Sequence, residues 1–143
     1  AMRGSCILAG FKTKTLPEID NLEKRWKKIE ELLKQSYKNY EFIYIHFKEL
    51  DEASHDKLPA KKKLLWEMLD SWFEKNIVQY KAKWVITGDH LTDSRSGRHK
   101  FGPVPLFIYP SLNSNKLKKF DEFNLKKSRL FSGDSLWRQI KNI

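Results

Sequence analysis

The chain has 143 residues, of which 40% are hydrophobic and 13% aromatic, so it is long enough to bury one hydrophobic core. Charged residues make up 32% of the chain, and no apolar run approaches the roughly 18 residues that a transmembrane helix needs, which excludes an integral membrane protein. The single cysteine, Cys6, excludes an internal disulfide and favours a reducing, cytoplasmic setting.

The formal net charge is +10, and the lysines are scattered along the whole chain. Such a surface is typical of a solvated lysine-rich protein, of one that attracts anionic phosphate substrates, or of one that binds nucleic acid. No zinc-finger, KH or RRM signature accompanies the charge, so nucleic-acid binding is the least favoured of these three interpretations.

The first elements predicted along the chain are a short strand, a long helix and a buried strand. Residues 6–10 favour the short strand. Thr15 and Glu18 have the spacing of a capping box, and apolar residues then recur at helical intervals, which predicts an amphipathic helix over residues 16–38. Residues 41–47 are dense in β-branched and aromatic side chains, as in a strand buried on both faces.

Helices and strands continue to alternate in the second half. In order, the pattern predicts a polar loop over 51–59, a helix over 60–80, a strand over 83–87, a long loop over 88–102, a strand over 104–109 and a last helix over 134–140. This alternation, with apolar strands, predicts an α/β fold in a single domain without an internal boundary.

Carboxylates and histidines follow two of the predicted strands. Asp51 and His55 come after the strand over 41–47, Asp89 and His90 close the strand over 83–87, and His99 lies in the next loop. In open α/β sheets ligands bind at the carboxyl ends of the strands, so we expect these five side chains to converge there. Asp and neutral imidazole are ligands for Zn²⁺ or Mn²⁺, and five such groups suggest a pair of metals, the usual arrangement for phosphoryl transfer.

Each of these motifs also has an ordinary structural interpretation. An Asp-His pair is common in turns, and a loop histidine such as His99 is usually solvent-exposed. The fourth histidine, His46, lies within a predicted strand and is more typical of a core histidine than of a ligand, so it is left out of the set.

Three segments, taken in order, resemble the archaeal-type cofactor-independent phosphoglycerate mutases of the alkaline phosphatase superfamily. They are residues 51–56 (Asp-Glu-Ala-Ser-His-Asp), 85–92 (Val-Ile-Thr-Gly-Asp-His-Leu-Thr) and 99–106 (His-Lys-Phe-Gly-Pro-Val-Pro-Leu), with a further Phe-Asp-Glu at 120–122. The resemblance covers roughly residues 41–137. It implies part of an alkaline phosphatase-like open sheet flanked by helices.

The resemblance also implies two divalent metal ions, Mn²⁺ or Zn²⁺, in the complete enzyme. It assigns Asp51, His55 and His99 to the first metal, and Asp89 and His90 to the second. In the family the second metal also takes an N-terminal aspartate and a nucleophilic serine. That serine is phosphorylated by phosphoglycerate and then returns the phosphoryl group to the other hydroxyl.

This chain departs from the family in length and in its first segment. No aspartate-bearing strand or nucleophile segment is identifiable before residue 41, and Ser54 replaces a glycine of the family motif. The chain is therefore expected to be the C-terminal portion only, a partial metal-binding domain over residues 1–143. The remainder of a parent polypeptide, or another chain, is expected to complete the fold, and whether this chain alone is an enzyme stays open.

Two classes of function follow. The first is the metal-binding part of a glycolytic mutase that interconverts 3- and 2-phosphoglycerate, or of a related metal-dependent phosphohydrolase. Its partner would be a phosphorylated small molecule, with Arg95, Arg98 and Lys100 as phosphate-binding candidates on charge alone. The alternative is a non-catalytic basic module, for nucleic acid or protein, that keeps the fold.

Overall fold

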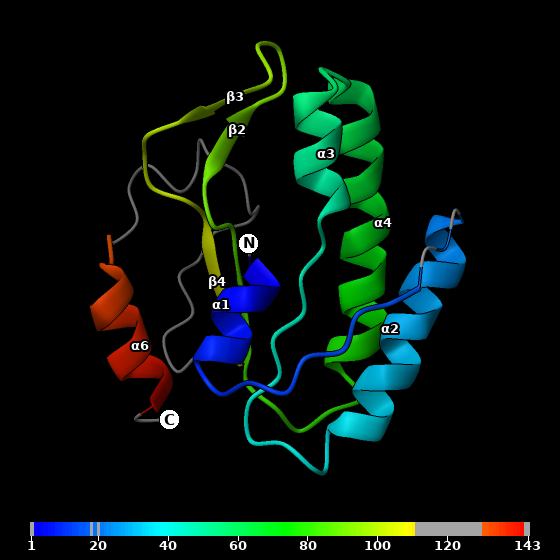
Figure 1. The fold of residues 1–143 in the computed structure, drawn as a ribbon, viewed down its shortest axis with the longest axis vertical. Helices are drawn as coiled ribbons and strands as arrows, with labels where there is room; N and C mark the ends of the chain where they lie inside the picture. The colour runs from blue at the N-terminus through cyan, green and yellow to red at the C-terminus, as the bar shows by residue number, and fades with distance from the viewer. Residues whose placement is uncertain (1, 18, 20, 111–129, 142–143) are drawn as a thin grey trace. The chain divides into compact units, whose positions relative to one another are not determined.

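The structure, a computed structural model, describes residues 2–17, 19, 21–110 and 130–141, and it divides into two compact units. The first unit spans residues 1–46 and the second spans residues 47–143. Figure 1 shows the helices and strands of both units. Among the described residues, none of the helices combines the length and the apolar character needed to cross a membrane.

The first unit contains α1 (Met2–Leu8) and α2 (Leu22–Ser36). The side chain of Asn21 caps α2 by accepting a hydrogen bond from the Lys24 backbone N–H at 2.9 Å. The helix predicted over 16–38 is therefore confirmed in its body, but its start is later than the capping-box spacing indicated. Its apolar stripe is confirmed by the burial of Trp26, Ile29 and Leu33.

Two strands predicted in the first unit are wrong. Residues 6–8 belong to α1, and no strand is assigned over 41–47. The segment over 41–47 instead uses side chains to contact the N-terminal residues. The ring of Phe42 packs edge-on against Phe11 at 5.8 Å, and the Tyr44 hydroxyl lies 3.9 Å from the Met2 sulfur. Composition predicts extended backbone, but a strand also needs a neighbouring ladder to pair with.

Two antiparallel helices begin the second unit. They are α3 (Glu49–His55) and α4 (Pro59–Ile77), which pack against each other (Figure 1). The helix predicted over 60–80 is confirmed as α4, with Pro59 in its first turn. The polar loop predicted over 51–59 is wrong, because α3 occupies most of it. Acidic residues in the first turn of α3, and a Lys48–Glu52 ion pair, favour the helix.

The core of the second unit lies along α4. Leu65, Leu69 and Trp72 recur at helical spacing and are buried. Phe47 packs edge-on against the ring of Trp72, with centroids 5.2 Å apart. From α3, Ala53 is completely buried, so the small side chain permits the close approach of that helix.

The described strands form two small antiparallel sheets. One pairs β1 (Trp84–Thr87) with β4 (Leu106–Tyr109), which confirms the strands predicted over 83–87 and 104–109. The other pairs β2 (Leu91–Asp93) with β3 (Arg98–Lys100) in a hairpin, so the single long loop predicted over 88–102 is wrong.

A last helix, α6 (Gly133–Lys141), confirms the helix predicted over 134–140. The described chain is thus a mixed structure of helices and small sheets, and the predicted open sheet is not confirmed. The Phe-Asp-Glu segment at 120–122, which is part of the family resemblance, lies outside the described residues.

The hairpin is held by Asp93 at the end of β2. Its carboxylate accepts from the Lys100 ammonium at 2.7 Å and from the Arg95 backbone N–H at 2.9 Å. The Lys100 hydrogen bond, and then that of Arg95, hold the pKa of the Asp93 carboxyl well below its usual range. One carboxylate therefore fixes both the loop and the far strand.

The packing of α3 on α4 leads to a first prediction. Ala53→Leu should lower the free energy of unfolding by about 1–3 kcal/mol, because a larger side chain overpacks a completely buried position. The matched control is Ala60→Leu, at an exposed position of α4, which should change it by less than about 0.5 kcal/mol. Urea unfolding measures both, and equal effects would contradict the packing.

The hairpin leads to a second prediction, on pH. A carboxyl whose pKa is lower in the folded state stabilises that state above its ordinary pKa of about 4, and the stabilisation declines as the pH falls below that value. Asp93→Asn should therefore lower the free energy of unfolding at pH 7, and this decrease should become smaller as the pH falls below about 4.

Urea unfolding of the parent chain and of Asp93→Asn at pH 7 and pH ~3 measures this difference. At pH 7, Lys100→Met should remove much of the effect of Asp93→Asn in a double-mutant cycle. A cost of Asp93→Asn that stays the same at both pH values would exclude the ion pair as its cause.

Candidate metal centre

One face of the β2–β3 hairpin points side chains at α3. Thr92 and His99 are direct partners across the two strands, so their side chains lie on the same face. On α3, Asp51 and His55 are four residues apart and share one face of the helix. Contacts between α3 and β2 place these two faces together.

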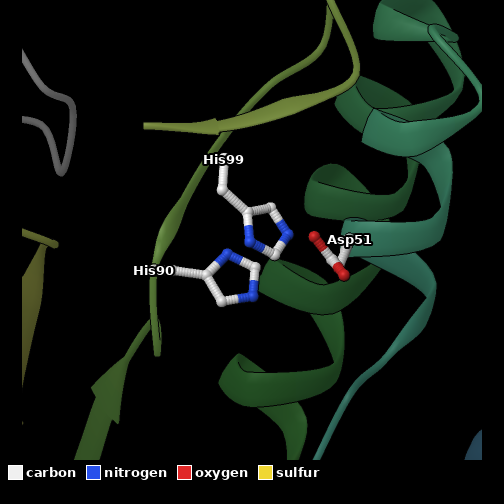
Figure 2. A group of neighbouring side chains, drawn as sticks. All are labelled: Asp51, His90 and His99. Atoms are coloured by element: carbon white, nitrogen blue, oxygen red, sulfur yellow. The ribbon is translucent and has the colours of Figure 1, made fainter. Parts of the chain in front are cut away.

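Asp51, His90 and His99 form the centre of the site. One ligand atom from each of them lies within 4.8 Å of the others. Figure 2 shows the Asp51 carboxylate reaching from α3 toward the two imidazole rings. Those rings are stacked, with centroids 3.9 Å apart. The predicted convergence of Asp51 and His99 is confirmed, although it occurs between a helix and a hairpin rather than at the edge of an open sheet.

His55 completes the group from the last turn of α3. Its Nε2 lies 3.1 Å from the Nε2 of His99 and 3.4 Å from a carboxylate oxygen of Asp51. Its Nδ1 lies 2.9 Å from the backbone carbonyl of Gly97. A carbonyl oxygen only accepts, so Nδ1 carries the hydrogen and, in the neutral ring, the lone pair is on Nε2.

This arrangement fits a divalent cation. The Nε2 lone pair of His55 faces the carboxylate of Asp51 and the ring nitrogen of His99. The His55 lone pair and the Asp51 carboxylate oxygen are both acceptors, so they repel one another unless a proton or a cation lies between them. Imidazole and carboxylate are the donor set of catalytic zinc sites, and the hydrogen bond to Gly97 is the usual support for a histidine ligand.

Gly97 is required for this support. Its φ is +69°, and a Cβ there would come within 2.9 Å of the His55 carbonyl oxygen. Any other residue would be strained in this backbone conformation and would push the loop away from α3.

Asp89 lies beside His90 at the edge of the group. Its carboxylate oxygen is 3.5 Å from the Nε2 of His90, and its side chain is 52% exposed. The structure thus brings together four of the five residues that the sequence singled out, whereas Asp89 contacts only its neighbour His90. Their division between two metals stays a prediction, and the geometry also groups His90 with Asp51 and His99.

The three phosphate-binding candidates are placed differently. Arg98 and Lys100 alternate with His99 along β3, so they lie on the opposite face of the strand. Lys100 pairs with Asp93 across the hairpin, and Arg95 lies in the exposed hairpin loop. None of these positions brings the candidates to the histidine face of the hairpin.

Sequence reasoning missed Thr92. Its hydroxyl lies 2.8 Å from Asp51 Oδ1 and 3.0 Å from His90 Nδ1. The signal that could have found it is the alternation of side chains in a strand. If residues 88–102 are interpreted as a hairpin, this alternation places Thr92 on the same face as His99. Lys62 was missed too; its ammonium reaches from α4 to the Thr92 backbone carbonyl at 3.3 Å.

The chain is similar to several phosphoglycerate mutases. It is 36% identical to the 2,3-bisphosphoglycerate-independent phosphoglycerate mutase of Methanococcus maripaludis strain C7 over 100 residues, which cover 67% of this chain and 25% of the relative. It is 33% identical to the enzyme of the same name from Picrophilus torridus over 135 residues, 90% of this chain and 33% of the relative. For the Pyrococcus abyssi enzyme the identity is 40% over 85 residues, 57% of this chain and 20% of the relative.

These alignments cover only part of each relative: the chain spans between a fifth and a third of their length. No solved structure gives a significant match. The sequence also matches the profile of the Metalloenzyme superfamily over residues 10–131, a range that includes all five candidate ligands. Because this match extends over most of the 143 residues, the chain belongs to the Metalloenzyme superfamily.

Proposed function

We propose that this chain is the metal-binding portion of an archaeal-type, 2,3-bisphosphoglycerate-independent phosphoglycerate mutase. The observation that carries the proposal is the convergence of Asp51, His90 and His99, with His55 against them, in a chain whose relatives have that name. The proposed substrate is a phosphorylated small molecule, with 3- and 2-phosphoglycerate interconverted by the complete enzyme.

The proposed ligands fall into two sets. Asp51, His55 and His99 would hold one divalent ion, Zn²⁺ or Mn²⁺, and Asp89 with His90 would hold a second. Such a pair supplies charge neutralisation of the phosphate and stabilisation of an in-line transfer. The second set has two protein ligands, so further ligands would come from a part of the enzyme outside these residues.

The nucleophile is also proposed to come from elsewhere in the enzyme. Ser54 is the serine nearest in sequence to the ligands of α3, but it is completely buried. Its hydroxyl donates to the Leu50 carbonyl at 3.0 Å, and the Ser94 hydroxyl points back to it at 3.5 Å. Both hydroxyls therefore serve the contact between α3 and the hairpin rather than reaching a substrate.

A third prediction concerns metal affinity. His99 contacts both His55 and His90, so His99→Ala should weaken Zn²⁺ or Mn²⁺ binding more than His90→Ala does. Loss of a ligand should lower the metal affinity by more than the 10–100-fold that is typical of losing a hydrogen-bond partner of a ligand. Calorimetry should show about one strong site per parent chain, because three ligands make a better site than two.

The matched control is His46→Ala, which removes the one histidine outside the ligand set and should leave the affinity unchanged. Equal losses from His99→Ala and His46→Ala, or no binding by the parent chain, would exclude the metal centre and favour the basic binding module.

A fourth prediction concerns turnover. The purified 143-residue chain should not interconvert 3- and 2-phosphoglycerate, because Ser54 and Ser94 are engaged in the structural contact. A coupled enolase assay measures the product 2-phosphoglycerate, and a phosphate assay run beside it detects hydrolysis. Any interconversion by the parent chain would contradict this prediction, and its loss in Ser54→Ala or Ser94→Ala would then identify the nucleophile. Release of phosphate alone would favour the phosphohydrolase.

A further inference from the structure

The hydroxyl of Thr92 lies between two candidate ligands from different elements. It is 2.8 Å from Oδ1 of Asp51, on α3, and 3.0 Å from Nδ1 of His90, just before β2. These three residues are partly buried, so the two contacts are partly shielded from water.

The two contacts fix where the hydrogens are. A threonine hydroxyl has one hydrogen, and a carboxylate only accepts. Two oxygens 2.8 Å apart need a hydrogen between them, so Thr92 must donate to Asp51. The remaining contact then requires that His90 Nδ1 donate to the Thr92 oxygen. The neutral His90 ring consequently has its lone pair on Nε2, the nitrogen that lies 3.5 Å from the Asp89 carboxylate.

We propose that Thr92 is a positioning residue that links the two proposed metal sites. Through one hydroxyl it orients Asp51, a proposed ligand of the first metal, and fixes His90, a proposed ligand of the second, with Nε2 available for coordination. The proposal rests on the proposed metal centre for its purpose, but the state of the His90 ring is a property of the metal-free chain.

His55 provides a parallel within the same site. Its Nδ1 donates to the Gly97 carbonyl, which leaves Nε2 as the lone-pair nitrogen there too. Two histidines from different elements are thus held with Nδ1 protonated, one by a backbone carbonyl and one by a side-chain hydroxyl. Lys62 fixes the backbone of Thr92 itself by donating to its carbonyl at 3.3 Å.

The first test is nuclear magnetic resonance of the metal-free chain at alkaline pH. Long-range ¹H–¹⁵N correlations of the imidazole rings report which nitrogen carries the hydrogen, and loss of signals in His90→Gln assigns that ring. In the parent chain and in Thr92→Ser, His90 should be protonated at Nδ1. In Thr92→Val, which has a similar shape without the hydroxyl, the Nδ1-protonated form should no longer dominate.

The second test is the affinity for Zn²⁺, measured by competition with a chromophoric chelator. Thr92→Val should weaken binding about 10–100-fold, the usual effect of losing a partner of a metal ligand. Thr92→Ser should restore affinity to within about threefold of the parent chain, since it keeps the hydroxyl. The matched control is Thr87→Val in β1, whose hydroxyl donates to the Pro105 carbonyl, and it should leave both the affinity and the His90 ring unchanged.

Several results would overturn the role of Thr92. The first is a His90 ring that carries its hydrogen on Nε2 in the parent chain. The second is a His90 ring whose protonated nitrogen is the same in Thr92→Val as in the parent, and the third is a Thr92→Ser variant that binds Zn²⁺ as weakly as Thr92→Val. If Thr92→Val fails to fold, the parent and Thr92→Ser spectra still decide. Failure of the parent chain to bind metal would count against the proposed function, whereas the ring state would still confirm or exclude the hydrogen bond from His90 to Thr92.

Discussion

The docking of one short hairpin on one short helix creates the whole candidate site. Asp51 and His55 come from α3. His90 immediately precedes β2 and His99 lies on β3, about forty residues later in the chain. Each element supplies two of these four donors, and two protein ligands seldom hold a metal without further ligands. The ligand set therefore exists only while the hairpin stays against α3, and the hydrogen bonds across that contact are as important as the ligands.

The same contact brings acceptor groups together at a cost. Nε2 of His55 lies 3.1 Å from a ring nitrogen of His99 and 3.4 Å from a carboxylate oxygen of Asp51, and at least two of these three atoms carry lone pairs. Crowded acceptors of this kind disfavour docking unless a cation or a proton relieves them. Metal binding and docking of the hairpin on α3 are therefore coupled. A divalent ion that binds only the docked form would stabilise that form.

Sequence reasoning succeeded where a signal was long or chemically specific. The apolar stripe of α4 extends over many turns, and the ligand residues stand out because few residue types bind metals. It failed where elements were short. Helix α3 has seven residues and a polar surface, and β3 is exposed along its whole length, so neither carries the hydrophobic period on which the prediction depends.

Thr92 illustrates the remaining limit. A threonine in a polar segment gives no sign of its partners, and its role became visible only when the strand register placed it opposite His99. The segment over 41–47 shows the reverse error: its side chains are those of a buried strand, but strand formation depends on a neighbour that local sequence does not specify.

The register of the hairpin has one further consequence. Side chains alternate strictly along β3, so His99 faces α3 while Arg98 and Lys100 face away. A slip of the pairing by a single residue would present a guanidinium or an ammonium to Asp51 and turn the imidazole outward. Such a slip would replace a cation-binding face by a cationic one. The Asp93–Lys100 ion pair and the left-handed Gly97 therefore determine the sign of the charge at this site, although neither of them belongs to the proposed ligand set.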